Sequence, residues 1–347
     1  MIILDTTIRD GSYAVDFKFS LKDVKDLVTK SERIGTKYIE IGHGQGLNAS
    51  SAKYGYSLHS DIEYIEAAKQ YSNKAFIGMF CIPGIARLED INNAAYHGLD
   101  FVRIGINASD YRESAPYIET ALNSNLEVFL NLMKTYTVSS NDFAEAAEFA
   151  QDSGVNTIYI VDSAGCMSED DISRYIDAAR DRSSVAIGFH GHNNLGLAVS
   201  NTVYCVIEKD IDYIDVSFQG LGRSVGNASY EQVVMALQKR GYDLDYDIPR
   251  LLEYGYSGLR NIVNKPLVNP LDYMCGYAGF HSSYLRDIYK CCNEKCVDPL
   301  RLILAYSDEN RSTMDYERLC RVAESLPKDM DDNPYSFADF FGDNFND

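Results

Sequence analysis

Short apolar runs alternate with amphipathic stretches along most of the chain. The runs are rich in β-branched and aromatic residues and have the length of buried strands, whereas the stretches between them repeat apolar positions at helical spacing. We expect strands at Ile2–Thr6, Tyr38–Ile41, Ala75–Phe80, Phe101–Ile104, Glu127–Leu132, Thr157–Val161, Ala186–His190 and Tyr213–Ser217. We expect helices at Leu21–Arg33, Asp61–Gln70, Ala115–Asn123, Asn141–Asp152 and Glu169–Asp181.

Eight such strands interleaved with helical stretches favour an α/β fold, a parallel (β/α)₈ TIM barrel. An open, doubly wound sheet is the alternative, but that fold usually carries a glycine-rich nucleotide-binding turn. Gly220, Gly222 and Gly226 do not have the spacing of that turn. We therefore predict a barrel.

The pattern becomes helical after Tyr230, with more helices than one barrel needs. The expected helices are Glu231–Arg240, Pro249–Val263, Ser282–Asn293, Pro299–Tyr306 and Tyr316–Leu326. We predict a catalytic barrel over residues 1–262, a helical C-terminal domain over 263–327 and an acidic, aromatic tail over 328–347. The tail is either disordered or docks its aromatic side chains on a partner or a sister subunit.

The overall charge narrows the class of partner. A net charge of −19 would repel a phosphate backbone, so we expect no nucleic-acid binding. The sequence shows neither a secretory signal nor an apolar run long enough for a membrane span, which predicts a cytoplasmic protein without a membrane partner. Its eight cysteines are then expected to be free thiols. We interpret the cluster Cys291, Cys292 and Cys296 as part of a helix rather than as a metal site.

Residues that are costly to bury collect where the predicted strands end. In a (β/α)₈ barrel the C-terminal ends of the strands carry the chemistry. The polar residues at or just beyond these ends are Arg9, Asp10, Glu40, His43, Arg103, Asn107, Lys134, Asp162, Ser163, His190, His192 and Asn227. Their distribution predicts an active site at this face of the barrel.

His190 and His192 are the strongest single signal for chemistry. Residues i and i+2 of a strand point to the same face, so both imidazoles can reach one point. Together with Asp10 from the first strand they would form an open face for a divalent ion, with positions left for water and substrate.

Arg9 stands beside the expected metal ligand Asp10. It is either an ordinary ion-pair partner or a fixed cation that stabilises a developing enolate oxygen. Glu40 either orients Arg9 or a ligand, or closes a buried network of charges.

Several segments together resemble the DRE-TIM metallolyases, the superfamily that includes HMG-CoA lyase, and most closely its 4-hydroxy-2-oxovalerate aldolase branch. The opening signature is Asp5–Ser12, which reads Asp-Thr-Thr-Ile-Arg-Asp-Gly-Ser. The other similar segments are Ile39–Leu47, Ser50–Gly55, Asp162–Gly165, His190–Leu195, Gly226–Ala228 and Gly276–Gly279. The resemblance extends over about residues 1–326.

The resemblance implies a metal-dependent carbon–carbon lyase acting on a 4-hydroxy-2-oxo acid. Asp10, His190 and His192 would bind Mn²⁺, or else Mg²⁺, Co²⁺ or Zn²⁺, and the ion would chelate the 2-oxo acid. Arg9 would stabilise the pyruvate enolate, with Ser163 near the substrate carboxylate and Asn227 also in the substrate site. It further implies an aldehyde co-product, and a C-terminal domain that docks an acylating aldehyde dehydrogenase; we also expect a homodimer.

Two positions depart from the aldolase pattern. The histidine that acts there as base on the 4-hydroxyl, three residues after the metal aspartate, is replaced by Tyr13. A tyrosine near the start of the helical region is replaced by His281. Our hypothesis is that the pair has exchanged roles, with His281 as general acid/base and Tyr13 orienting the substrate hydroxyl. The alternative is independent drift in an enzyme with another substrate.

Three further residues bear on substrate choice. Lys134, Tyr136 and Arg223 stand where we would expect smaller or less charged residues. The added positive charge favours a bulkier or more anionic acceptor. Two competing functions stay open: a Claisen-type enzyme that uses an acyl-CoA, and a non-catalytic scaffold subunit.

Overall fold

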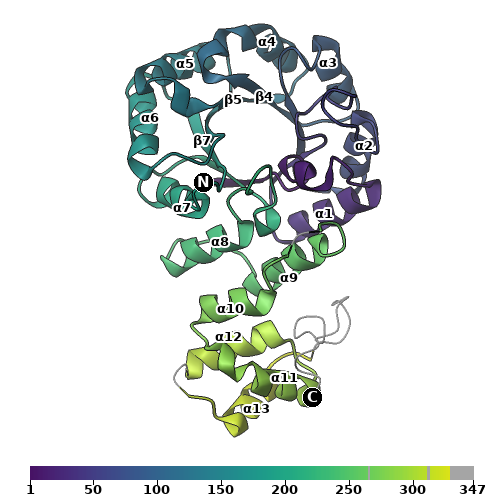
Figure 1. Ribbon diagram of the computed structural model, residues 1–347, viewed down its shortest axis with the longest axis vertical. Helices are drawn as coiled ribbons and strands as arrows, with labels where there is room; N and C mark the ends of the chain where they lie inside the picture. The colour runs from purple at the N-terminus through teal and green to yellow at the C-terminus, as the bar shows by residue number, and fades with distance from the viewer. Residues whose placement is uncertain (265, 311–312, 329–347) are drawn as a thin grey trace. The chain divides into compact units, whose positions relative to one another are not determined.

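Eight parallel strands close into a barrel in chain order, because β1 pairs with both β2 and β8. The computed structural model describes residues 1–264, 266–310 and 313–328. The strands are β1 (Ile2–Asp5), β2 (Tyr38–Ile41), β3 (Phe76–Cys81), β4 (Phe101–Asn107), β5 (Glu127–Met133), β6 (Thr157–Asp162), β7 (Ala186–Gly191) and β8 (Tyr213–Val216). The predicted (β/α)₈ barrel is confirmed, and all of its predicted strands are present (Figure 1).

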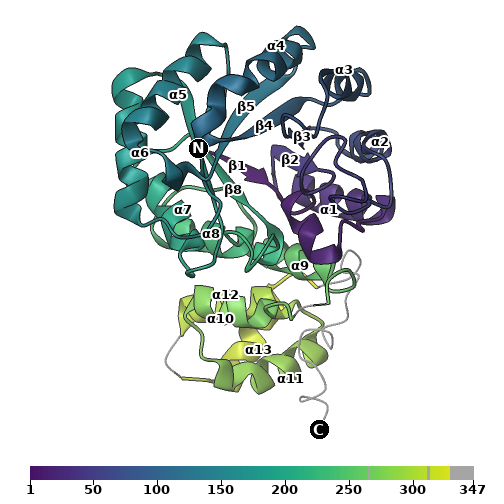
Figure 2. The same ribbon diagram turned by 45° about the horizontal axis from the view of Figure 1, so that its top comes forward.

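Helices surround the ring of strands, as Figure 2 shows from a second direction. They are α1 (Leu21–Arg33), α2 (Asp61–Tyr71), α3 (Leu88–Tyr96), α4 (Ala115–Asn123), α5 (Ser140–Asp152), α6 (Glu169–Arg182), α7 (Ala198–Ile207) and α8 (Tyr230–Lys239). Serine capping boxes start α1, α2, α5 and α6, which explains why their first residues could be predicted closely. Neither α3 nor α7 was expected; α7 is mostly buried and therefore lacks a clear polar face.

The chain forms two compact units, the first ending at Leu244 and the second beginning at Asp245. The second contains α9 (Ile248–Leu259), α10 (Pro270–Ala278), α11 (Leu285–Lys295), α12 (Pro299–Glu309) and α13 (Tyr316–Ser325). The predicted C-terminal helices are thus present, with α10 in addition. The domain boundary expected after residue 262 stays a prediction. The expected tail begins at residue 328, and from residue 329 onward it lies outside the described residues.

Two further expectations concern the cysteine cluster of the second unit and the absence of a membrane-spanning helix. Cys291 and Cys292 lie within α11, as the helical interpretation of the cysteine cluster predicted. None of the helices in the described part of the chain combines the length and the apolar character that a bilayer span requires.

A layer of aromatic rings lies inside the barrel near the N-terminal ends of the strands, which is called its lower end below. Tyr38, Phe101, Phe129 and Tyr159 pack together with Leu4, and neighbouring rings meet edge to face. Glycine makes room for them: a Cβ on Gly78 would lie 2.2 Å from the ring of Phe101. This layer fills that part of the barrel interior.

A polar layer lies above the aromatic one. Because inward positions recur at every second residue, Glu40, Arg103 and Asp215 follow the aromatic residues of β2, β4 and β8. All three are buried, with exposed fractions of 2% or less. The fold therefore places charged groups directly under the ends of the strands.

Glu231 ties α8 to the loop that follows β8. Its buried carboxylate accepts hydrogen bonds from the backbone N–H of Gln219 (2.9 Å) and from the hydroxyl of Ser229 (2.8 Å). Burial raises the pKa of Glu231 to about 7, although these hydrogen bonds lower it in part. Folding therefore binds a proton at this residue between its ordinary pKa and about pH 7.

We predict that Glu231 makes the fold less stable as pH rises. The unfolded carboxyl loses its proton near its ordinary pKa of 4.5, whereas the folded one keeps it to about 7. Relative to Glu231→Gln, the free energy of unfolding of the wild type should fall by about 1–3 kcal/mol between pH 5 and pH 8. Urea unfolding at several pH values measures this, with the exposed Glu119→Gln as control. Parallel pH profiles for wild type and Glu231→Gln would contradict it.

Candidate metal centre and active site

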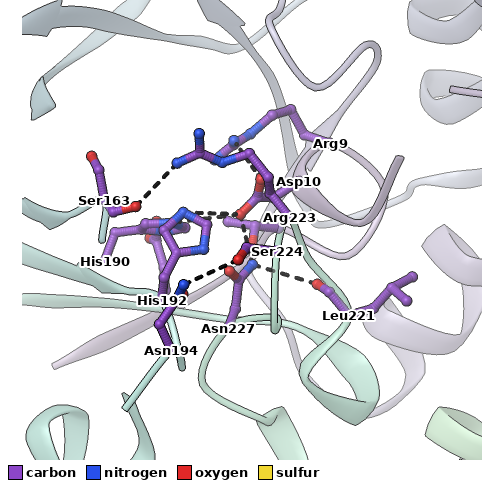
Figure 3. Close-up of polar contacts among 12 residues, drawn as sticks. Arg9, Asp10, Ser163, His190, His192, Asn194, Leu221, Arg223, Ser224 and Asn227 are labelled. Carbon is purple, nitrogen blue, oxygen red and sulfur yellow. Dashed lines mark hydrogen bonds and ion pairs between the residues drawn. The ribbon is translucent and has the colours of Figure 1, made fainter. Parts of the chain in front are cut away.

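The three predicted metal ligands meet at the C-terminal end of the barrel. Asp10 follows β1, His190 lies in β7 and His192 just beyond it, and one ligand atom from each lies within 4.8 Å of the others. Asp10 Oδ2 is 3.5 Å from His190 Nε2 and 3.9 Å from His192 Nε2. All three side chains are buried, and Figure 3 shows them pointing toward one another.

The surroundings of these ligands fit a divalent metal ion. Asp215 holds His190 Nδ1 at 2.7 Å, which leaves Nε2 directed at Asp10. The side-chain amide of Asn227 donates to Asp10 Oδ2 at 2.8 Å and so fixes that carboxylate. Hydrogen bonds that orient the ligands in this way are the usual support of a metal site. One carboxylate and two imidazole nitrogens, with one side open, suit a divalent ion that also binds substrate.

The protonation states favour the same use. Burial alone would raise the pKa of Asp10, but Arg9 and the two imidazoles hold it well below its ordinary value. Burial lowers the pKa of His192 to about 4, and the charge of Asp10 offsets only part of that shift. Near neutral pH the site therefore offers a carboxylate and a neutral imidazole, the forms that bind metals.

Arg9 is held in place from two sides. Its Nε donates to Glu40 Oε2 at 2.7 Å, and its Nη1 lies 3.3 Å from Asp10 Oδ1. The guanidinium stacks over the ring of Phe80, 4.7 Å from the centroid. Burial alone would lower the pKa of Arg9, but Glu40 and Asp10 raise it above its ordinary value. Arg9 is thus a fixed, permanently charged donor.

Both interpretations of Glu40 are visible. The carboxylate orients Arg9, and the same Oε2 atom also accepts from Arg103 at 3.0 Å. Arg103 in turn donates to Asp215 Oδ2 at 2.6 Å. Glu40 therefore acts on Arg9 from within a buried charge network, and it does not line the cavity.

A cavity of about 280 Å³ opens above the metal ligands. Its polar lining consists of Arg9, Asp10, Tyr13, Gln45, Asn107, Asn131, Lys134, Ser163, His190, His192 and Arg223. The predicted site residues Tyr13, Lys134 and Ser163 thus share one cavity with Arg9 and the ligands. Asn227 donates a hydrogen bond to Asp10, and its predicted role in binding substrate stays a prediction.

Tyr13 and His281 lie in different units of the chain. Tyr13 faces the cavity, and burial raises the pKa of its phenol, an effect that Arg9 partly opposes. His281 belongs to the helical unit, where it is exposed and its Nδ1 accepts from the backbone N–H of Ser283 at 3.2 Å. Their exchange of roles stays a prediction.

The sequence analysis missed three residues of this region. Asp215 orients His190, and Gln45 and Asn131 line the cavity. Asp215 could have been found, because a charged residue at an inward position of a predicted strand needs a buried partner. Gln45 and Asn131 give no such signal in the sequence.

Comparison with known proteins places this site in a family. The chain is 39% identical over 258 residues to an oxaloacetate decarboxylase from Mycobacterium tuberculosis, covering 74% of this chain and 76% of that one. It is 33% identical over 303 residues to a 4-hydroxy-2-oxovalerate aldolase from Thermomicrobium roseum (87% and 85% covered). An aldolase of the same name from Bacillus cereus is 31% identical over 327 residues (94% and 96% covered).

Solved structures agree on the fold. An HMG-CoA lyase from Bacillus subtilis matches with a TM-score of 0.66 at 19% identity, covering 77% of this chain and 94% of that one. The carboxyl transferase domain of Rhizobium etli pyruvate carboxylase matches with a TM-score of 0.66 at 14% identity (94% and 61% covered). The HMGL-like family profile matches residues 1–256, which include the whole barrel and every predicted metal ligand. The chain therefore belongs to the HMGL-like family.

Proposed function

We propose that this protein is a divalent-metal-dependent carbon–carbon lyase that cleaves or forms a 4-hydroxy-2-oxo acid through a pyruvate enolate. The observation that carries the proposal is the meeting of Asp10, His190 and His192 beside the fixed guanidinium of Arg9. Relatives named 4-hydroxy-2-oxovalerate aldolase, which match most of the chain, support the choice of substrate class.

A divalent ion at this site would chelate the keto and carboxylate oxygens of the 2-oxo acid and polarise its keto group. Arg9 provides the second positive charge, beside the point where the enolate oxygen develops. Ser163 lines the cavity, and its hydroxyl, which accepts a hydrogen bond from the backbone N–H of Lys134, can donate its own proton to the substrate carboxylate. When the bond between C3 and C4 breaks, its electron pair moves into the enolate, the 4-hydroxyl loses its proton and an aldehyde leaves.

Proton removal from the 4-hydroxyl is the step for which we propose His281, with Tyr13 orienting the hydroxyl. Burial raises the pKa of the Tyr13 phenol further above its ordinary value, which makes this phenol a poor base. We further propose Mn²⁺ as the metal, a cytoplasmic homodimer, and an acylating aldehyde dehydrogenase as the partner that receives the aldehyde. Resemblance to the aldolases supports these points.

Decarboxylation of a 2-oxo acid with a carboxylate on C3 is a second candidate. The only imidazoles among the cavity-lining residues are the two metal ligands. Loss of CO₂ needs no proton removal from a hydroxyl, so the metal ligands and Arg9 would suffice to form the same enolate. The similarity to an oxaloacetate decarboxylase supports this variant. Release of pyruvate from oxaloacetate, compared with release from 4-hydroxy-2-oxovalerate, distinguishes the two.

Formation of the enolate is directly testable with pyruvate. We expect Mn²⁺ to support exchange of the C3 protons of pyruvate for deuterium, and chelation to abolish it. His192→Ala should weaken Mn²⁺ binding by about 100-fold or more, because one of three protein ligands is lost. Proton NMR follows the exchange and titration calorimetry follows the metal. His97→Ala, which alters a surface ion pair with Glu66, is the control.

The same assays separate the competing functions. Exchange that requires acetyl-CoA would favour the Claisen-type enzyme. Absence of both exchange and cleavage in Mn²⁺-loaded protein would favour the scaffold subunit. Unchanged Mn²⁺ affinity in His192→Ala would contradict the metal site itself.

Arg9→Lys should lower the exchange rate by about 100-fold or more. An ammonium group cannot keep both the bond to Glu40 and the contact with Asp10 while it faces the substrate. The steady-state rate of exchange with saturating pyruvate measures this loss. Mn²⁺ affinity should change far less, and the exposed Arg33→Lys serves as control. A rate close to wild type would show that Arg9 is only a structural ion-pair partner.

His281→Ala should lower aldol cleavage by about 100-fold or more while Mn²⁺ affinity is unchanged, since His281 would take the proton of the 4-hydroxyl and is not a metal ligand. Tyr13→Phe should cost less, because it removes only an orienting hydrogen bond. Cleavage rates across pH 6–9 check both variants. Equal, small losses from the two substitutions would contradict the exchange of roles.

A further inference from the structure

The cavity carries more positive charge than a singly charged 2-oxo acid requires. Three permanently cationic side chains line it, Arg9, Lys134 and Arg223, against the one carboxylate of Asp10. This excess stands out in a chain whose net charge is −19. Arg9 is already committed to Asp10 and Glu40. The excess positive charge of the cavity therefore comes from Lys134 and Arg223.

The two residues that carry these cations both contact Ser163, which follows β6. The backbone N–H of Lys134, after β5, donates to Ser163 Oγ at 3.0 Å. The guanidinium of Arg223, after β8, donates through Nη2 to the carbonyl oxygen of Ser163 at 3.1 Å. Figure 3 shows the Arg223 side chain extended toward Ser163 beside the metal ligands. Ser163 therefore holds the backbone of Lys134 and the guanidinium of Arg223, and both residues line the same cavity.

The backbone at Lys134 supports a specific placement. Its φ of 57° lies in the left-handed region, which is unfavourable for a residue with a side chain. The hydrogen bond to Ser163 helps to hold this conformation. Such a position usually selects glycine or asparagine, so a lysine here is better explained by what its side chain faces than by the turn.

Neither cation is neutralised by an ion pair in the described part of the chain. The field of Lys134 reaches Asp110, but hydrogen bonds from Ser109 and Asn107 already occupy that carboxylate. Lys69 and Lys209, in contrast, each pair with an aspartate at 2.7–2.8 Å. Exposed cations without carboxylate partners, set at a cavity rim, attract and bind an anion.

We propose that Lys134 and Arg223 form a second anion subsite, so that the substrate carries a carboxylate or a phosphate at the end distant from its 2-oxo group. This rests on the proposed function, because the first carboxylate must occupy the metal and Arg9. The side chains of Lys134 and Arg223 then select among substrates. A dianionic 2-oxo acid is bound at both of its ends, whereas a 2-oxo acid with an apolar distal end is bound at one end only.

Binding of matched ligands tests this without turnover. Titration calorimetry on the full chain with Mn²⁺ would compare 2-oxopentanoate, 2-oxoglutarate and 4-phosphono-2-oxobutanoate. They differ in whether the distal end is neutral, a carboxylate or a phosphonate. We expect at least one of the two dianions to bind about tenfold or more tightly than 2-oxopentanoate, and added salt to reduce this preference. Which dianion binds better identifies carboxylate or phosphate as the natural group.

Variants then assign the preference to the two side chains. Arg223→Gln and Lys134→Gln should each reduce the preference for the dianion by about threefold to tenfold, and the double variant should bring it close to one. The exposed Arg33→Gln should keep the wild-type preference.

Two results would overturn the subsite. Equal affinity of the wild type for all three ligands would show that no distal anion is recognised. Equal losses for all three in the variants would show that these cations serve the first carboxylate instead. A retained preference without lyase activity would contradict the proposed function alone, whereas failure of any 2-oxo acid to bind would contradict both.

Discussion

The site depends on a closed ring of buried charges inside the barrel. Asp10 contacts Arg9 at 3.3 Å, Arg9 contacts Glu40 at 2.7 Å, and Glu40 contacts Arg103 at 3.0 Å. Arg103 reaches Asp215 at 2.6 Å, and Asp215 holds His190 at 2.7 Å. His190 returns to Asp10 at 3.5 Å, which completes the ring. Each member is oriented by the next, so the candidate metal ligands and the guanidinium of Arg9 are parts of one arrangement.

The formal charges of this ring explain why a cation would stabilise it. Three carboxylates face two arginines, which leaves one negative charge in excess when His190 is neutral. An uncompensated buried charge is strongly unfavourable. A divalent ion bound beside Asp10 compensates it, and a proton on His190 is the other solution. Burial would lower the pKa of His190, but Asp10 and Asp215 raise it. The surrounding carboxylates therefore favour a positive charge beside Asp10 and His190.

The spacing of hydrophobic residues and the helix caps made the barrel predictable. Each strand is a short buried run, and four helices begin at a serine capping box. The meeting of Asp10, His190 and His192 was predictable because residues i and i+2 of a strand point to the same face and the ends of the strands meet at one face of the barrel. Asp215 was overlooked because nothing local links it to His190; their contact exists only after the barrel closes between β7 and β8. Cavity residues such as Asn131 are likewise brought in by closure alone.

The candidate metal site and the rim of its cavity are built from different parts of the fold. The ring fixes Arg9 and the metal ligands from below, through residues that belong to strands. Lys134 and Arg223 stand in loops after β5 and β8, and both contact Ser163. Because loops tolerate substitution better than a closed network of buried charges, selectivity can change here without disturbing the ring. The residues beneath the candidate metal site therefore belong to strands, whereas the two cations at its rim belong to loops.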